Sequence, residues 1–128
     1  MKTHNVPGAP AAIGPYCHAV RTGHLVFCSG QTPIDPTTNQ LIEGSISDQT
    51  QRVLDNIAVV LGGLGLTLQD VVKTTVFLKD MGDFEEMNAT YAACFAGHTP
   101  ARTTIAIRQN PLDARIEIEC IAEVKEEG

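Results

Sequence analysis

The chain has 128 residues, the ordinary size of one domain, and its 15 acidic against 9 basic residues give a net charge of −6. This charge repels phosphate backbones and anionic membranes, so it argues against nucleic acid or a membrane surface as the main partner. No stretch reaches the about 18 apolar residues of a membrane span, and the N-terminus lacks the apolar segment of a signal peptide. Residues 1–128 are therefore expected to form a single cytoplasmic domain.

Four cysteines and four histidines are scattered along the chain without the spacing of a metal site. No C-x-x-C pair is present, and three of the cysteines fall in apolar patterns, which is typical of buried free thiols in a reducing compartment. The glycines at 62, 63 and 65 follow a predicted helix instead of preceding one, so they do not form a phosphate-binding loop. We expect no metal and no nucleotide cofactor.

The first half of the chain predicts an irregular arm, two strands and a helix. Prolines and glycines favour an extended arm over residues 1–15, and residues 16–21 and 25–29 have the composition of a strand pair. Ser29-Gly30 ends the second strand, where it exposes a hydroxyl and lets backbone approach a ligand, although Ser-Gly is also ordinary in loops. After a loop with a short strand at 40–42, apolar spacing predicts a helix over about 48–61, capped by Ser47 or Asp48.

The second half begins with a strand over residues 71–78, whose nearly continuous apolar run is typical of a central strand buried on both faces. Lys73 within it must extend to the solvent or reach a sheet edge. A second helix is predicted from Asp83, which with Glu86 resembles a capping box, to about Gly97. Asn88 falls in the apolar stripe of this helix. An unpaired buried amide costs about 1–3 kcal/mol, so Asn88 either braces backbone or points into a polar cleft.

Residues 101–107 and 115–124 are predicted as strands, and alternate side chains of a strand share a face. The rows expected to face the core are Thr103, Ile105 and Ile107 in the first strand and Ile116, Ile118, Cys120, Ala122 and Val124 in the second. Arg102 and Glu119 then project from one polar side, opposite each other if the strands pair directly. The connection over 108–114 also leaves room for another strand between them. A surface ion pair, worth roughly 0–1 kcal/mol, is the plain interpretation.

The order β-β-α-β-α-β-β predicts an α+β fold, a mixed sheet with two helices packed on one face. The other face would carry apolar residues together with Arg102 and Glu119, and a chain of this length has no element left to cover it. We therefore expect a homo-oligomer with polar clefts between its subunits.

Short motifs along essentially the whole chain resemble those of the RidA/YjgF family of reactive imine deaminases, in that family's order. They are Ala9-Pro10-Ala11-Ala12-Ile13-Gly14-Pro15-Tyr16, Ser29-Gly30-Gln31, Val72-Lys73-Thr74-Thr75-Val76-Phe77, Asn88-Ala89-Thr90-Tyr91, Pro100-Ala101-Arg102 and Ile116-Glu117-Ile118-Glu119. The resemblance implies a chorismate-mutase-like fold, a homotrimer with three clefts between subunits, and hydrolysis of 2-iminopropanoate and 2-iminobutanoate to 2-keto acids and ammonia. It implies no cofactor.

The resemblance also implies roles for two charged residues. Arg102 would clamp the substrate carboxylate with the paired donors of its guanidinium. Glu119 would position the attacking water and relay a proton as general acid and base. Thr104 stands where many relatives carry a cysteine, and its hydroxyl can still hold water.

Four further residues match positions that shape the cleft of that family, namely Tyr16, Ser29, Gly30 and Asn88. The implied substrates are intermediates that pyridoxal-phosphate enzymes release, which links the protein functionally to those enzymes. One alternative is a non-catalytic trimer that binds 2-keto or other carboxylic acids, which needs Arg102 but not Glu119. An endoribonuclease or translation inhibitor is disfavoured by the charge of −6 and by the lack of a basic, aromatic-lined groove.

Overall fold

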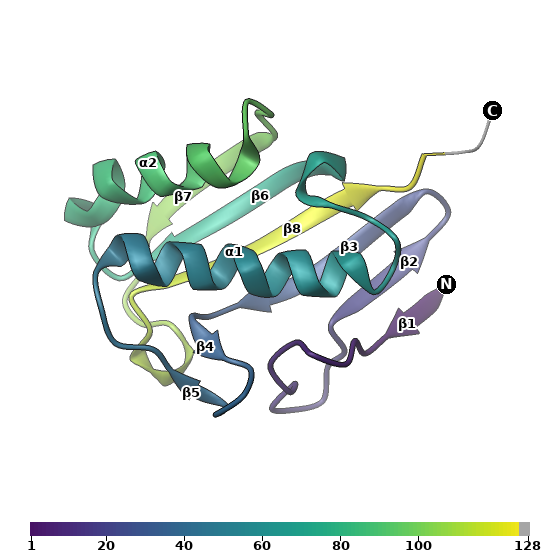
Figure 1. Ribbon diagram of the computed structural model, residues 1–128, viewed down its shortest axis with the longest axis horizontal. Coiled ribbons are helices and arrows are strands. Elements are labelled where there is room, and N and C mark those ends of the chain that lie inside the picture. Colours follow the sequence, from purple (N-terminus) through teal and green to yellow (C-terminus); the bar gives the residue numbers. More distant parts are fainter. Residues whose placement is uncertain (126–128) are drawn as a thin grey trace.

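The computed structural model describes residues 1–125 and shows a mixed sheet with two helices packed on one face (Figure 1), which confirms the predicted α+β class. The six-stranded sheet has the order β1-β2-β3-β8-β6-β7, and only β6 and β7 run parallel. Its strands are β1 (Lys2–His4), β2 (Ala19–Thr22), β3 (Leu25–Gln31), β6 (Val71–Leu78), β7 (Ala101–Ala106) and β8 (Ile116–Glu123). A small separate pair, β4 (Ile34–Asp35) and β5 (Gln40–Leu41), precedes the first helix.

The N-terminal arm is more regular than its composition predicts. Residues Lys2–His4 form β1, which pairs antiparallel with β2, because the first proline comes only at position 7 and leaves these backbone donors free. Strand β2 starts at Ala19, three residues later than predicted, since Cys17 and His18 bind other parts of the chain.

Helix α1 (Ile46–Gly62) begins earlier than predicted, and Ser45 caps it. The Ser45 hydroxyl accepts from the Asp48 N–H at 3.1 Å, and the Asp48 carboxylate accepts from the Ser45 N–H at 3.2 Å. Ser47 shares a hydrogen bond with Thr90 on the second helix instead. The prediction of Ser47 or Asp48 as the cap was therefore wrong, although Asp48 does complete the capping box.

Helix α2 (Phe84–Phe95) occupies the predicted span, with Asp83 at its N-cap position. The Asp83 side chain makes no cap hydrogen bond, so the predicted capping box is wrong. Its carboxylate accepts from the Arg115 guanidinium at 3.0 Å, an ion pair that a local pattern does not reveal.

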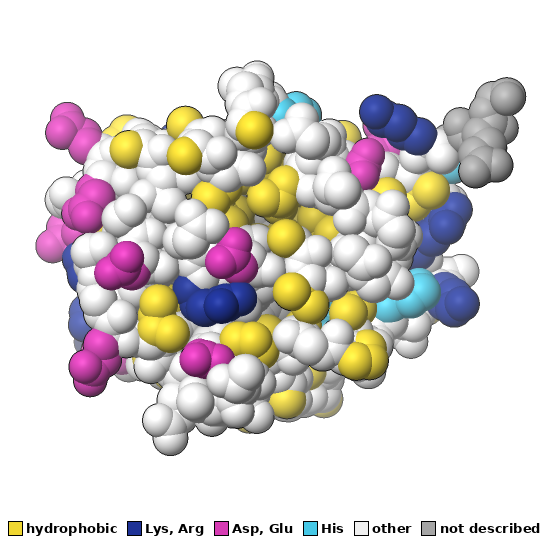
Figure 2. Space-filling model, viewed as in Figure 1, with side chains coloured by type: hydrophobic (Ala, Val, Ile, Leu, Met, Phe, Trp, Pro, Cys, Tyr) yellow, Lys and Arg dark blue, Asp and Glu magenta, His cyan; other side chains and the backbone are white. Residues whose placement is uncertain are grey.

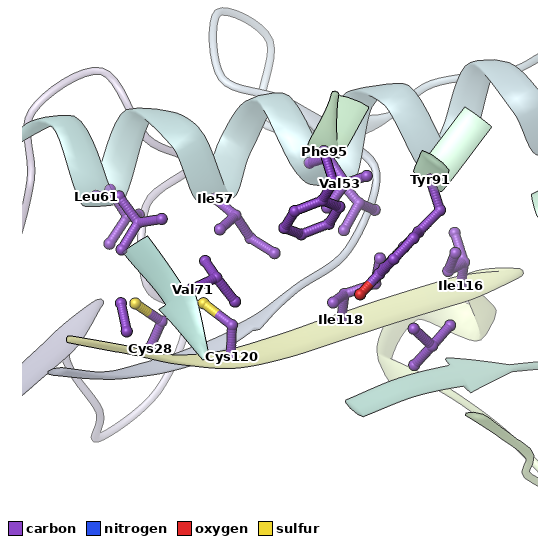
Figure 3. Packing of buried hydrophobic residues seen from close by; sticks show 14 of the residues in the cluster. Cys28, Val53, Ile57, Leu61, Val71, Tyr91, Phe95, Ile116, Ile118 and Cys120 are labelled. Carbon is purple, nitrogen blue, oxygen red and sulfur yellow. The ribbon is translucent and has the colours of Figure 1, made fainter. Parts of the chain in front are cut away.

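The core lies between the sheet and the two helices. Figure 3 shows Ile57 and Leu61 of α1 above Cys28 of β3 and Cys120 of β8, while Phe95 of α2 packs beside α1. All four cysteines are free thiols, as predicted, but the expectation of three buried ones was wrong: Cys28 and Cys120 are buried, whereas Cys17 and Cys94 are partly exposed. Acidic side chains in the first turns of both helices face the favourable end of the helix dipole, and Figure 2 shows acidic groups at the end of the molecule where the helices begin.

The second face of the sheet, which we call the open face, is turned away from α1 and α2. Strand β6 alternates between buried and partly exposed residues, so the prediction that it is covered on both faces does not hold within one chain. Large apolar side chains remain 39–43% exposed on the sheet strands, namely Leu25, Phe27, Val72 and Ile105. Within residues 1–125, no helix is long and apolar enough to cross a bilayer.

Strand β6 lies between β7 and β8, so the two C-terminal strands do not pair directly. Arg102 is paired with Thr74 and Thr104 with Val76, and both β6 partners are buried under the helices. Thr103 and Ile105 therefore face the open side, and the core row predicted for residues 101–107 was wrong. The row predicted for β8 is confirmed through Ala122, since Ile116, Ile118, Cys120 and Ala122 are buried. The register of edge strand β7 with β6 decides which of its two rows faces the helices. The alternation of residues within β7 does not encode this choice.

This register separates the two charged residues that the sequence placed together. Glu119 is paired with Thr75 on the open face, whereas Arg102 lies on the helix face. Adjacent β6 residues point to opposite sides of the sheet. The expectation that Arg102 and Glu119 share one polar side is therefore wrong within a single chain.

Candidate functional site

The first group of candidate residues surrounds the end of β3. The Ser29 hydroxyl donates to the Cys17 carbonyl at 2.7 Å, and the Ser29 N–H donates to the His18 carbonyl at 3.0 Å. These bonds hold the segment that carries Tyr16 against the sheet. The Tyr16 ring is half exposed, and its hydroxyl oxygen accepts from the Ile13 N–H at 3.3 Å. Ser29 thus acts here as a brace, while Tyr16 presents its ring to a pocket.

That pocket, of about 220 Å³, is lined by Tyr16, Gly30 and Glu117, among others. A β-carbon on Gly30 would lie 2.8 Å from the Glu117 carboxyl carbon, so glycine is what permits this carboxylate to lie so close to the backbone. Burial raises the pKa of the Glu117 carboxyl, and the neighbouring charge of Glu119 raises it further. A half-buried carboxyl with a raised pKa in a pocket has the properties of a proton-transfer group.

Glu117 was not singled out from the sequence, because Glu117 and Glu119 stand two positions apart on the same row of β8. Alternation puts both on the open face but does not tell them apart. Only the approach of β3 to β8 shows that Glu117 meets Gly30. The one sequence signal for this contact was Gly30, because a glycine within a strand often marks the close approach of another segment.

Glu119 lines a neighbouring pocket of about 230 Å³ with Lys73 and Thr75. The Lys73 ammonium donates to the Thr74 carbonyl at 2.8 Å and to the Thr103 hydroxyl at 3.3 Å. Lys73 therefore reaches the edge strand β7, one of the two outcomes expected for it. Tyr16 and Gly30 do not line this second pocket, so the structure groups them with Glu117.

The second group surrounds Arg102 on the other side of the sheet. The Arg102 guanidinium carbon lies 4.8 Å from the ring centre of Tyr91 and 5.6 Å from that of Phe84. Attraction between the cation and the two aromatic faces restrains the guanidinium, and the paired N–H donors of a guanidinium suit a carboxylate ligand. Arg102, Tyr91 and Asn88 line a mostly apolar pocket of about 370 Å³ at the end of α2.

Two polar atoms near Arg102 lack partners. Asn88 Oδ1 and Thr104 Oγ1 are buried, and neither finds a hydrogen bond within the described residues. Thr104 follows Arg102 on the same row of β7. Buried polar atoms without partners are uncommon in native proteins and are typical of places where a ligand or another chain completes the contacts. Of the two outcomes left open for Asn88, the polar cleft fits this geometry.

One chain thus brings Tyr16, Gly30 and Glu117 together on one side and Asn88, Arg102 and Thr104 on the other, but it does not join the two sets. No group of three or more His, Cys, Asp or Glu side chains in residues 1–125 has the arrangement of a metal site. The first set contains the half-buried carboxylate of Glu117, and the second contains the Arg102 cation beside two aromatic rings.

Comparison with known proteins places these residues in context. Residues 6–124 match the sequence profile described as Endoribonuclease L-PSP. A protein of Salmonella typhimurium named 2-iminobutanoate/2-iminopropanoate deaminase is 45% identical, covering 94% of this chain and 96% of that protein. The crystal structure of the YjgF gene product from E. coli matches with a TM-score of 0.92 at 41% identity, covering 98% of this chain and 100% of that one. The crystal structure of E. coli TdcF with bound serine matches with a TM-score of 0.92 at 35% identity, covering 98% and 100%.

Proposed function

Because the chain belongs to the Endoribonuclease L-PSP family, which includes the RidA/YjgF proteins, we propose that it hydrolyses reactive 2-imino acids to 2-keto acids and ammonia. The observation that carries this proposal is its identity of 43–45%, over 94% of its length, with relatives named 2-iminobutanoate/2-iminopropanoate deaminase. The substrates would be 2-iminopropanoate and 2-iminobutanoate, released by pyridoxal-phosphate enzymes. No cofactor is invoked, since spontaneous hydrolysis of imines is already fast and needs only positioning and electrostatic help.

Arg102 is proposed to clamp the carboxylate of the imino acid. Its contacts with the rings of Tyr91 and Phe84 restrain the guanidinium, whose two parallel N–H donors would meet the planar carboxylate. The unpaired Asn88 Oδ1 and Thr104 Oγ1 beside it would then accept or donate hydrogen bonds to the substrate or to water. The apolar lining of this pocket suits the short aliphatic side chain of the substrate.

The proton-transfer group is proposed to be Glu117, because it shares its pocket with Tyr16 and Gly30 and its pKa is raised. As its carboxylate takes a proton from water, the oxygen attacks the imine carbon and the C=N π electrons move to nitrogen. The carboxyl group returns this proton to nitrogen, which gives a carbinolamine. The carboxylate then takes the proton of the carbinolamine hydroxyl and delivers it to nitrogen, so the C–N bond breaks, ammonia leaves and the C=O bond of the keto acid forms. The sequence-based assignment of this role to Glu119 remains a second candidate that parallel variants of the two glutamates distinguish.

The assembly proposed is a homotrimer of chorismate-mutase-like subunits with clefts between them. Two features support it: the site sets lie on opposite faces of one sheet, and the open face exposes large apolar side chains such as Phe27 and Ile105. Sedimentation at micromolar concentration should give the mass of about three chains. A stable monomer that hydrolyses imines would contradict this assembly.

The alternative is a trimer that binds carboxylic acids without catalysis. The crystal structure of the relative TdcF holds a bound serine, which is a carboxylic acid, and this observation supports keeping the binding alternative. The discriminating experiment generates 2-iminopropanoate and 2-iminobutanoate in situ and follows their loss and the release of ammonia, with and without the protein. Faster hydrolysis supports the deaminase. Binding of 2-oxobutanoate without acceleration of hydrolysis would support the alternative.

A further inference from the structure

His18 is a buried imidazole whose two ring nitrogens both bind the main chain of residues 5–15, the part of the N-terminal arm that follows β1 and that is called the arm below. The side chain is 5% exposed. Its Nδ1 accepts from the Val6 N–H at 2.9 Å, and its Nε2 lies 2.8 Å from the Pro10 carbonyl. The His18 main-chain N–H also donates to the Asn5 side chain at 3.3 Å. These three bonds therefore tie His18 to both ends of the segment 5–10.

The partners of the ring determine its form. Nδ1 must be unprotonated because it accepts from an N–H, and Nε2 must carry the proton because a carbonyl can only accept. The ring is therefore the neutral Nε2–H tautomer, with a donor at one end and an acceptor at the other. A glutamine amide offers the same pair of one donor and one acceptor, whereas leucine has neither.

The arm is anchored at Val6 and held more weakly beyond Pro10. Val6 is buried, and a β-carbon on Gly63 would lie 2.6 Å from its Cγ1, so Val6 packs directly on the end of α1. Beyond Pro10 the bonds from main-chain N–H groups to side chains are longer: the Ala11 N–H lies 3.5 Å from Asn39 Oδ1, and the Ile13 N–H lies 3.3 Å from the Tyr16 hydroxyl. Within the loop the Tyr16 N–H donates to the Gly14 carbonyl at 2.9 Å. The loop is thus fixed at one end by the 2.8 Å contact of His18 with Pro10 and at the other by the 2.7 Å bond from Ser29 to the Cys17 carbonyl.

Tyr16 connects His18 to the proposed site. Tyr16 lines the pocket that contains His18 and Val6, and it also lines the pocket that contains Gly30 and Glu117; Ala11 of the arm lines both as well. Tyr16 is therefore part of a wall that the two pockets share. A displacement of Tyr16 from the His18 side would change the pocket that contains Glu117.

We propose that His18 is a positioning residue that holds Tyr16 in the substrate pocket by binding the arm on both sides of Pro7 and Gly8. This inference rests on the proposed deaminase function for its kinetic readout. His18 itself touches no reacting atom in this scheme. It acts through Tyr16, and its neutral donor and acceptor are the chemistry that the role requires.

The test compares His18→Leu with His18→Gln, each alone and combined with Tyr16→Ala. We expect His18→Leu to lower kcat/KM for 2-iminopropanoate about tenfold, equivalent to about 1.4 kcal/mol. The loss should appear mainly in KM, because a misplaced pocket wall weakens binding of ground state and transition state alike. His18→Gln should stay within about threefold of the wild type. In the Tyr16→Ala background His18→Leu should cost less than about twofold, since the wall through which it acts is gone.

Hydrogen exchange of the Val6 amide gives a readout that does not depend on catalysis. Exchange should be slow in the wild type and in His18→Gln but fast in His18→Leu. If His18→Leu does not fold, His18→Asn takes its place, because its amide is one methylene shorter and cannot span both partners. An equal loss from His18→Leu in both Tyr16 backgrounds, or slow Val6 exchange in that variant, would overturn the proposal. A wild type that protects Val6 but hydrolyses no imine would overturn only the deaminase function.

Discussion

The two glutamates of β8 provide the sharpest test of the site. Glu117→Gln and Glu119→Gln each remove one negative charge from the same face of the same strand, at Cα positions about 7 Å apart. Glutamine keeps the volume of the side chain, so the close packing of residue 117 against Gly30 is preserved. The pair therefore separates the effect of a particular carboxylate from that of the local charge.

We expect Glu117→Gln to lower kcat for 2-iminopropanoate by about 10²-fold to 10⁴-fold, the usual contribution of general acid and base catalysis. This corresponds to about 2.7–5.4 kcal/mol of transition-state stabilisation. Glu119→Gln should change kcat by less than about threefold, because its carboxylate lies in the other pocket. The assay follows ammonia release and loss of the imine, with binding of 2-oxobutanoate as a check that the pocket survives.

The pH profile adds a second criterion. Burial and the charge of Glu119 both raise the pKa of Glu117, and a base must be ionised to act. The acid limb of kcat/KM should therefore lie above the range of an ordinary carboxylate, and Glu119→Gln should move it to lower pH. Full activity of Glu117→Gln together with a large loss in Glu119→Gln would refute this assignment and restore Glu119 as the catalytic carboxylate.

The same raised pKa has a consequence for stability. The folded state binds a proton at Glu117 more readily than the unfolded state, so ionised Glu117 disfavours folding at pH values above its folded-state pKa. Glu117→Gln should therefore raise the melting temperature at pH 7, and the difference from the wild type should shrink as the pH falls through that pKa. A lower melting temperature at pH 7 would contradict the burial argument.

Three further variants test single contacts. Arg102→Lys should remain folded but lose about 30-fold to 200-fold in kcat/KM, since lysine lacks the paired donors and a charged hydrogen bond is worth about 2–3 kcal/mol; near-native efficiency would rule out the clamp. Gly30→Ala puts a β-carbon 2.8 Å from the Glu117 carboxyl carbon, so we expect activity to fall while urea unfolding changes little, because the flexible carboxylate can swing away. Ser45→Ala should lower the free energy of unfolding by about 1 kcal/mol in urea titrations and leave kcat unchanged, because it removes only the cap of α1.

Elements with local sequence signals could be predicted without the structure. The bounds of β6 and the span of α2 follow from apolar runs and from the glycines and prolines that end them. The buried row of β8 follows from its strict alternation over eight residues. The resemblance to RidA/YjgF motifs suggested Arg102 and Tyr16 as candidate site residues, because each of these motifs is contiguous in the chain.

Features that depend on the pairing of distant segments appeared only in the folded chain. The parallel register of β7 with β6 turned Arg102 toward the helices, and the approach of β3 to β8 distinguished Glu117 from Glu119. Asp83 bound Arg115, 32 positions away, instead of capping its own helix. Alternation and capping patterns describe a segment relative to its own axis. Which face meets the core, and which polar group finds a partner, is set by neighbours that lie far away in the chain.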